Sequence, residues 1–232
     1  KIVGLRADFF SHDRIQWGIF RTAQFGGKGR PEDIESIVNL LIGRDNRGDG
    51  GINISNEPGN QLAGIDFKIS LGKNNRFKIF SQIVGEDEAG YLPSRTMYLM
   101  GLSLETSFRN SPARFSFNYS DTESSSGLKN YSYSHGIYKD GYRYMNKPLG
   151  ASIDADSDIG ILFFETKLNK GFMSLRLFSG NINKNRNSQN IWGPEKFKVE
   201  GLEFSRSYKV NSDLETSFNF IYHRKKGVAS VS

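Results

Sequence analysis

The chain has 232 residues, a hydrophobic fraction of 37%, a formal net charge of +6 and no cysteine. Its mean hydropathy is −0.51, and the absence of any run of about 18 apolar residues excludes a transmembrane helix. The absence of cysteine also excludes disulfides. The positive charge is equally compatible with nucleic acid, lipopolysaccharide or an anionic glycan as a partner. A membrane β-barrel is not excluded, because only alternate residues of its strands face lipid.

Segments of about ten residues with alternating apolar and polar side chains recur along the chain. Successive side chains of a strand point to opposite faces, so each segment predicts a strand with one apolar face. We expect ten strands, including a poorly alternating one at 76–84 and one with a bulge near Gly201. The apolar faces of the other eight are formed by Val3, Leu5, Ala7 and Phe9; Ile15, Trp17 and Ile19; Ala63, Ile65, Phe67, Ile69 and Leu71; Tyr98, Met100, Leu102, Leu104 and Phe108; Phe115, Phe117 and Tyr119; Leu162, Phe164 and Leu168; Met173, Leu175 and Leu177; Leu214, Phe218, Phe220 and Tyr222.

One segment, residues 31–42, departs from the strand pattern. It starts with Pro and two acidic residues, and then places Ile34, Ile37, Val38 and Leu41 at helical spacing. This pattern predicts a short amphipathic helix inside a long loop. Its apolar stripe needs a cover, so we expect the helix to pack as a lid or plug on a barrel mouth. Binding to a membrane surface is the weaker alternative, because the first turn is acidic.

Short and long connections alternate strictly along the chain. The long ones are expected at residues 23–59, 85–95, 123–157 and 181–195. A soluble β-sandwich would also show alternating strands, but an up-and-down outer-membrane barrel additionally places its short turns on one side and its long loops on the other. We therefore predict an all-β, up-and-down antiparallel outer-membrane β-barrel, with residues 1–232 forming part of one transmembrane domain. With short turns in the periplasm, the last strand runs upward, so further strands are expected before and after this chain.

Acidic segments offer two weak site hypotheses. The loop at 85–95 contains Asp87 and Glu88 close to Arg95, and ion pairs across the mouth are a better explanation for it than acid–base catalysis. Asp154, Asp156 and Asp158 partly match a calcium-binding loop, but Ile159 stands where its sharp turn needs Gly. A looser Ca²⁺ site is therefore only a minor alternative. The three histidines are far apart in sequence, and no nucleotide-binding or nucleophile motif occurs.

The segment at 131–144 is the richest in aromatic residues. Its tyrosines could stack on sugar rings, with neighbouring Asn and Arg bonding to hydroxyls or carboxylates, or they could pack against one another as a plug. The two interpretations are compatible. Stacking on nucleic-acid bases is a weak third option.

Several stretches together resemble the capsule assembly protein Wzi family. They are residues 26–31, 43–46, 60–67, 85–95, 138–144 and 149–154. The resemblance implies a closed outer-membrane barrel that acts as a lectin and holds exported capsular polysaccharide at the cell surface. It implies no enzyme, and it places this chain in the later portion of the family's sequence.

The combined prediction is a non-catalytic lectin in the outer membrane of a Gram-negative bacterium. Its expected partners are surface polysaccharide and membrane lipid, without a cofactor or nucleic acid, and a monomer is favoured. A passive or substrate-specific porin is the alternative, because a polar lumen also suits a channel. The candidate glycan-binding residues are Asp87, Tyr91, Arg95, Asn130, Tyr133, Tyr138, Tyr142, Arg143, Tyr144 and Trp192.

Overall fold

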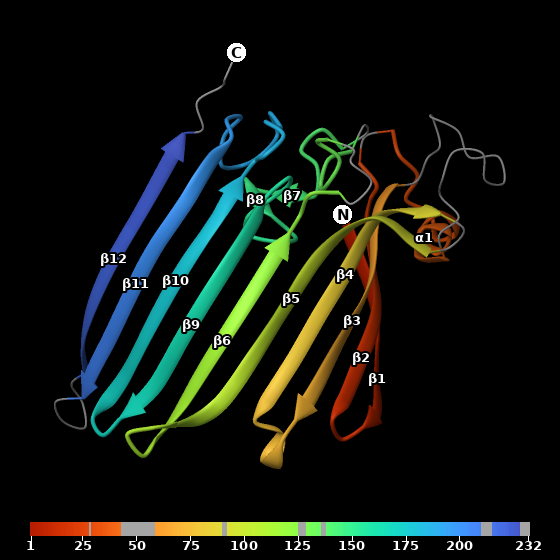
Figure 1. Ribbon diagram of the computed structural model, residues 1–232. Coiled ribbons are helices and arrows are strands. Elements are labelled where there is room, and N and C mark those ends of the chain that lie inside the picture. Colours follow the sequence, from red (N-terminus) through yellow and green to blue (C-terminus); the bar gives the residue numbers. More distant parts are fainter. Residues whose placement is uncertain are drawn as a thin grey trace.

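The computed structural model describes residues 1–27, 29–42, 59–89, 92–124, 129–135, 138–209 and 215–227. Its main element is a ten-stranded antiparallel sheet with the strand order β1-β2-β3-β4-β5-β6-β9-β10-β11-β12. The sheet is curved but not closed, with β1 and β12 at its two edges (Figure 1). The predicted up-and-down arrangement is confirmed.

Each strand pairs with the next in the chain except where the small β7–β8 hairpin intervenes. No helix in the described ranges is long and apolar enough to cross a membrane. The elements are β1 (Ile2–His12), β2 (Ile15–Phe25), α1 (Ile34–Ile42), β3 (Gly59–Leu71), the 3-10 turn η1 (Lys73–Asn75), β4 (Phe77–Ala89), β5 (Leu92–Phe108), β6 (Ser111–Asp121), β7 (Arg143–Tyr144), β8 (Lys147–Pro148), β9 (Asp158–Leu168), β10 (Gly171–Ile182), β11 (Phe197–Lys209) and β12 (Glu215–Gly227).

Tight turns lie at one end of the sheet and the long connections at the other (Figure 1). The turn between β5 and β6 holds Arg109 and Asn110 at φ of 48° and 62°. Two successive residues with positive φ form the turn type whose twist matches that of a hairpin. The predicted segregation of short and long connections is therefore present.

Residues 85–95 are not the loop that the sequence predicts. β4 and β5 stay paired from Gly85 opposite Thr96 to Ala89 opposite Leu92, so residues 85–89 and 92–95 extend their hairpin. It continues past the last paired residue of β3, which is Ala63 opposite Gly85. Gly and Pro suggested a hinge here, but backbone pairing between the two arms of the hairpin overrides that local preference.

The two faces of the sheet differ as the alternation predicts. On the outer face, large apolar side chains such as Ile65 and Phe67 are 43% and 40% exposed. On the inner face, onto which the connections after β6 and β10 fold, ion pairs join side chains of different strands. These pairs are Arg6–Asp66, Lys78–Glu105, Arg114–Glu165 and Arg176–Glu203.

Phenylalanines lie over glycines on the inner face. Phe20, Phe80 and Phe178 stand directly opposite Gly64, Gly101 and Gly201. A Cβ on each of these glycines would lie 2.5, 2.5 or 2.2 Å from the Cζ atom of the facing ring. Glycine is needed at each position because the phenyl ring occupies the space that a side chain would take. The ring in turn covers the exposed backbone of the glycine.

Helix α1 packs against the outer face, so the expectation of a lid or plug on the mouth is wrong. Its Leu40 is fully buried against Ala23 and Phe25 of β2. Odd-numbered residues of β2 share the outer face with Trp17 and Ile19, whereas the even-numbered residues face inward. The helix begins after Asp33, which accepts a hydrogen bond from Ser36 N at 2.8 Å, and not at Pro31.

The apolar stripe of α1 is only partly covered. Ile37 packs beside Leu40, but Ile34 and Val38 are 81% and 47% exposed. The sequence identified the amphipathic helix, but it did not identify which side of the stripe meets the sheet.

Candidate functional site

Two connections fold together over the inner face at the long-loop end, and we call them the cap. They are residues 122–124, 129–135 and 138–157, after β6, and residues 183–196, after β10. The cap reaches across to β2, where the Tyr142 hydroxyl lies 2.7 Å from Thr22 Oγ1 and Gln24 Nε2 donates to Gly141 O at 3.2 Å. The cap therefore covers the inner face at the long-loop end, although its sequence predicts only loops.

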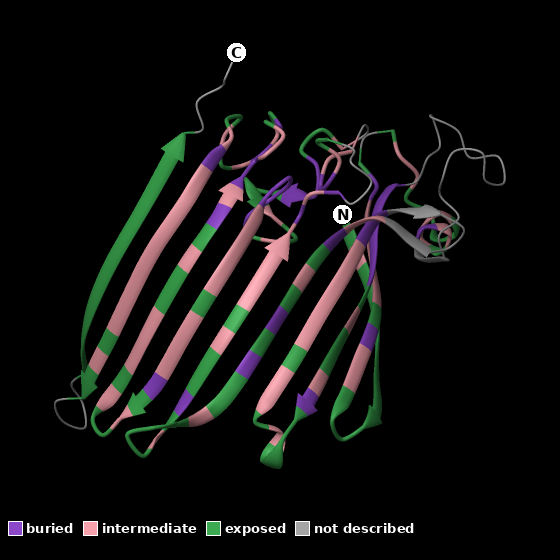
Figure 2. Ribbon diagram, viewed as in Figure 1, coloured by how far each residue is buried: buried purple, intermediate pink, exposed green. Residues whose placement is uncertain are grey.

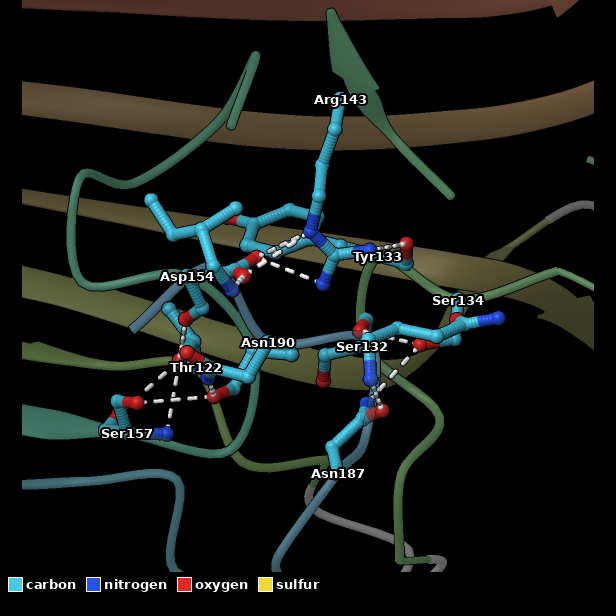
Figure 3. A network of polar contacts seen from close by, with 12 residues as sticks. Thr122, Ser132, Tyr133, Ser134, Arg143, Asp154, Ser157, Asn187 and Asn190 are labelled. Atoms are coloured by element: carbon cyan, nitrogen blue, oxygen red, sulfur yellow. Dashed lines mark hydrogen bonds and ion pairs between the residues drawn. The ribbon is translucent and has the colours of Figure 1, made fainter. Parts of the chain in front are cut away.

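A buried ion pair holds the centre of the cap (Figure 3). Arg143 Nε donates to both carboxylate oxygens of Asp154 at 3.0 Å, and the side chains are 5% and 0% exposed. Arg143 Nη1 also donates to the carbonyls of Tyr133 and Asp140. Ile191 N donates to Asp154 Oδ2 at 2.8 Å. The pair therefore ties the two cap connections together, with backbone groups bonded to both of its side chains.

Buried asparagines support the second connection, and sequence analysis missed them. Asn183 Nδ2 donates to the carbonyls of Asn187 and Gly193, while Asn190 Nδ2 donates to Ala155 O at 2.9 Å. The Asn187 side chain reaches Ser134 of the first connection (Figure 3). The only signal in the sequence is the density of Asn in this segment, which is also typical of an ordinary turn.

Tyr133 and Tyr142 are packing residues of the cap. Each is 5% exposed, and their rings are stacked with centroids 6.3 Å apart. Tyr133 N donates to Glu86 Oε2 at 2.7 Å, and burial raises the pKa of the Tyr133 hydroxyl to about 12. Gly141, at φ 65°, comes so close to Tyr133 that an added Cβ would lie 2.1 Å from its carbonyl oxygen. The prediction that Tyr133, Tyr142 and Arg143 contact glycan is not compatible with this burial.

Other predicted glycan residues remain accessible. Tyr144 is 64% and Trp192 is 51% exposed, and Trp192 Nε1 is fixed by a hydrogen bond to Ser152 O. Arg95 is half-buried, with its Cζ 4.1 Å from the ring centroid of Tyr131.

The remaining predicted residues differ in their surroundings. Tyr138 is half-buried and donates to Gly26 O at 3.2 Å. Asn130 is exposed, and its amide faces Asp156 Oδ2 at 3.2 Å. Asp87 lies on β4 opposite Ser94, and Tyr91 lies outside the described residues.

The three aspartates of the suggested calcium site point to different partners. Asp154 pairs with Arg143, Asp156 accepts from Asn185 Nδ2 at 3.1 Å, and Asp158 lies 3.0 Å from Lys184 Nζ. Burial raises the pKa of the Asp156 carboxyl. Within the described part of the chain, no group of three His, Cys, Asp or Glu side chains is placed to hold a metal. The Ca²⁺ alternative is therefore wrong for this trio, since the sequence spacing does not make the carboxylates converge.

A cavity of about 1060 Å³ lies beneath the cap. Trp192 and Ile153 contribute to it from the cap, and Phe80, Phe163 and Phe178 contribute from the inner face of the sheet. Two guanidinium groups flank Phe163, with Arg114 Cζ 5.8 Å and Arg176 Cζ 5.7 Å from its ring centroid. The exposed Trp192 thus belongs to a concave surface that combines aromatic and charged side chains.

An up-and-down sheet with an apolar outer face, a charged inner face and a cap of long loops defines a membrane β-barrel wall. The chain belongs to the family of the capsule assembly protein Wzi, whose model matches residues 1–226. The resemblance, the barrel fold and the outer-membrane location that the sequence predicted are thereby confirmed.

Two relatives support this assignment. An uncharacterised 55.8 kDa protein in the cps region of Klebsiella pneumoniae is 34% identical over 226 residues, which are 96% of this chain and 44% of that protein. The solved structure of Escherichia coli Wzi, described as a carbohydrate-binding β-barrel of the outer membrane involved in group 1 capsule assembly, matches with a TM-score of 0.79 and 29% identity. That match covers 97% of this chain and 49% of the solved chain, so this chain spans about half the length of its relatives.

Proposed function

We propose that this chain is part of a non-catalytic lectin that binds capsular polysaccharide and attaches it to the cell surface. One observation carries the proposal. The cap uses buried pairs such as Arg143–Asp154 for its own structure, yet leaves Tyr144 and Trp192 largely exposed. Exposed aromatic faces on a rigid support suit sugar rings, because little conformational entropy is lost when they are covered. The carbohydrate-binding description of the E. coli structure supports the same ligand class.

The Arg95 guanidinium, which lies over the Tyr131 ring of the cap, favours an acidic polysaccharide. Arg95 stacks on Tyr131, and Asn130 is exposed on the same cap. A guanidinium group is suited to the carboxylate of a uronic acid, since its donors match the two oxygens. We assign the contacts to Tyr144, Trp192, Arg95 and Asn130, and to half-buried Tyr138.

A porin is the second candidate, and its inner face with both charge signs favours it. The cap argues against an open channel, because Tyr142 and Gln24 connect the cap to β2 across the inner face. Conductance through a lipid bilayer distinguishes the two. A steady open pore supports the porin, whereas a closed lumen with polysaccharide binding supports the lectin.

The decisive experiment compares Tyr144→Ala/Trp192→Ala with Tyr144→Phe/Trp192→Phe. We expect the alanine variant to bind purified capsular polysaccharide at least about tenfold more weakly, since stacked aromatics commonly dominate an interface. The phenylalanine variant keeps flat faces and is expected to bind within about threefold of the unaltered protein. Both variants must reach the outer membrane in equal amounts. Equal polysaccharide binding by the alanine variant would refute this site.

A further inference from the structure

A cluster of basic residues lies on the outer face of β11 and β12, at the long-loop end. Lys198 stands directly opposite Lys226, and Glu200 stands opposite Arg224. The next pairs along the same face are Leu202–Tyr222 and Phe204–Phe220, which are apolar. The four charged residues therefore lie next to the apolar part of the outer face, on the side of the long loops. Together they carry three positive charges and one negative charge.

This cluster contains an unfavourable cross-strand pair. Like charges at directly opposed positions destabilise a sheet, and Lys198 and Lys226 occupy such positions. Glu200 lies 2.6 Å from Lys198 Nζ and offsets one charge. Neither Arg224 nor Lys226 makes an ion pair with any residue in the described ranges. The cluster thus keeps two positive charges without a counter-ion from the part of the protein that the structure describes.

The same level of the sheet shows how an opposed like-charge pair is normally compensated. Asp121 of β6 stands directly opposite Asp158 of β9 on the outer face. Lys184 lies between them, with its Nζ 3.9 Å from Asp121 and 3.0 Å from Asp158. The acidic pair has one cation between two carboxylates, whereas the basic cluster has one carboxylate, Glu200, among three cations. An anion from outside the protein would offset this excess of positive charge.

The height of the cluster indicates where that anion lies. Lys198 and Lys226 are four residues beyond the Leu202–Tyr222 pair, which is roughly 10 Å along the axis of a tilted strand. Aromatic side chains such as Tyr222 mark the border of the apolar band in outer-membrane barrels. The cations therefore stand at the border between the acyl chains and the polar groups of the outer leaflet.

We propose that Lys198, Arg224 and Lys226 bind the phosphate group of a phosphorylated glycolipid of the outer leaflet. Arg224 supplies a planar pair of N–H donors for phosphate oxygens, and the two lysines supply point charges. Acyl chains of the same lipid would lie on Leu202, Tyr222 and Phe220, which continue the surface toward the membrane centre. Backbone alternation places Lys198 and Lys226 on the outer face, away from the cap, whereas Arg224 also borders the cavity that Trp192 lines.

The test uses protein purified from outer membranes and incorporated into lipid nanodiscs. The variant Lys198→Gln/Arg224→Gln/Lys226→Gln is compared with Lys170→Gln/Arg206→Gln/Lys209→Gln, which removes the same charge at the tight-turn end. The probes are bisphosphorylated lipid A, dephosphorylated lipid A and inorganic pyrophosphate. We expect the first variant to retain bisphosphorylated lipid A about tenfold more weakly, while the control variant is unchanged. Dephosphorylated lipid A should be retained poorly by every form.

A gain-of-binding variant keeps the proposal testable if the triple variant assembles badly. Glu200→Gln removes the one acidic side chain, so it should retain bisphosphorylated lipid A more tightly. Equal losses in the two triple variants, or no effect of Glu200→Gln, would overturn the proposal. Displacement of the lipid by pyrophosphate at equal concentration would also overturn it, because the cluster would then bind phosphate from any source. Polysaccharide binding is measured in parallel with Lys198→Gln/Lys226→Gln, which leaves Arg224 and the cavity intact, and is expected to stay unchanged.

Discussion

The sheet and the cap are stabilised in opposite ways. The sheet repeats one arrangement, in which backbone pairing joins neighbouring strands while partly exposed ion pairs such as Arg176–Glu203 line the inner face. The cap has no repeat. It depends on individual buried interactions, above all Arg143–Asp154, and both of these side chains are almost completely removed from solvent (Figure 2 shows how burial differs along the chain).

This difference separates assembly from surface chemistry. A partly exposed ion pair contributes little on average, so the sheet tolerates the loss of one of them. Loss of one member of a buried pair leaves an uncompensated charge and is costly. We therefore expect substitutions in the cap to disrupt the cap alone, whereas substitutions that place charge on the outer face of the sheet disrupt membrane assembly.

The largest effect is expected from Arg143→Met. It leaves the Asp154 carboxylate buried beside Ile191 N without its cation, at a cost of about 3–5 kcal/mol. Limited proteolysis should then cleave the cap between β6 and β9 much faster. Folding of the barrel in lipid, followed by its heat-dependent migration in gels, should be unchanged.

The double variant Arg143→Met/Asp154→Leu serves as the control. It removes both charges, and replacing a whole buried ion pair by apolar residues is often nearly neutral. Cap resistance to proteolysis should therefore recover in part. If the double variant were cleaved as fast as the single one, the pair would not be what holds the cap together.

The next largest effect concerns the outer face of the sheet. Ile65 stands between Ile19 and Ile83 and is 43% exposed toward the outside. Ile65→Lys should reduce folding into lipid vesicles by about 2–4 kcal/mol if the residue lies near the membrane centre. Gln82→Lys adds the same charge on the inner face, directly opposite Asp66, and should cost far less. Equal damage by both substitutions would show that the two faces are wrongly assigned.

A smaller effect is expected where phenylalanine covers glycine. In Gly201→Ala the new Cβ would stand 2.2 Å from Cζ of Phe178, so the ring must swing away. We expect a loss of about 1–2 kcal/mol in the free energy of unfolding, measured by denaturant titration in lipid. Gly160→Ala is the matched control, since its Cβ would have no neighbour closer than 3.7 Å. A similar loss in the control would mean that chain flexibility, and not the ring, explains the result.

The sheet could be predicted from the sequence because its rules are local. Alternation along the chain identifies the two faces of each strand, and tight turns between neighbouring strands determine the order. The error at residues 85–95 arose where Gly and Pro suggested a loop but pairing between β4 and β5 continued. The position of helix α1 was also predicted wrongly. Leu40 packs against Ala23 and Phe25, which lie in a separate segment of the sequence, and no local pattern indicates that contact.

The cap could be predicted only as a location. Its residue types suggested sugar binding equally for Tyr133 and Tyr144, although the structure buries the first and exposes the second. The difference follows from tertiary contacts, such as the bond from Tyr133 N to Glu86, which no spacing in the sequence reveals. Aspartates at calcium-like spacing were misleading for the same reason, since Arg143 and Lys184 arrive from elsewhere in the chain.

The smallest effect is expected from Lys184, whose ammonium group contacts the carboxylates of Asp121, Glu123 and Asp158. Its hydrogen bond lowers the pKa of Glu123, and its own pKa is raised because bonds to Glu123 and Asp158 outweigh desolvation. A carboxyl with a lowered pKa contributes stability above its unfolded pKa, about 4.3, and loses it as the pH falls. A lysine with a raised pKa contributes below about 10.4 and loses it as the pH rises.

Lys184→Met should therefore loosen the cap by about 1 kcal/mol between roughly pH 5 and 10, a value reduced for partial exposure of the pair. Amide hydrogen exchange of residues 183–190 measures this loosening, because opening of the cap exposes their backbone groups. The difference from the unaltered protein should shrink as the pH falls through the lowered pKa of Glu123, because the protonated carboxyl no longer needs the lysine charge. Asn185→Ala is the control for lost hydrogen bonding alone, since Asn185 contacts Glu123 and Asp156 without a charge and its effect should not follow this pH profile. A Lys184→Met effect that stayed constant from pH 7 to pH 3 would show that packing of the lysine stem, and not its charge, stabilises the cap.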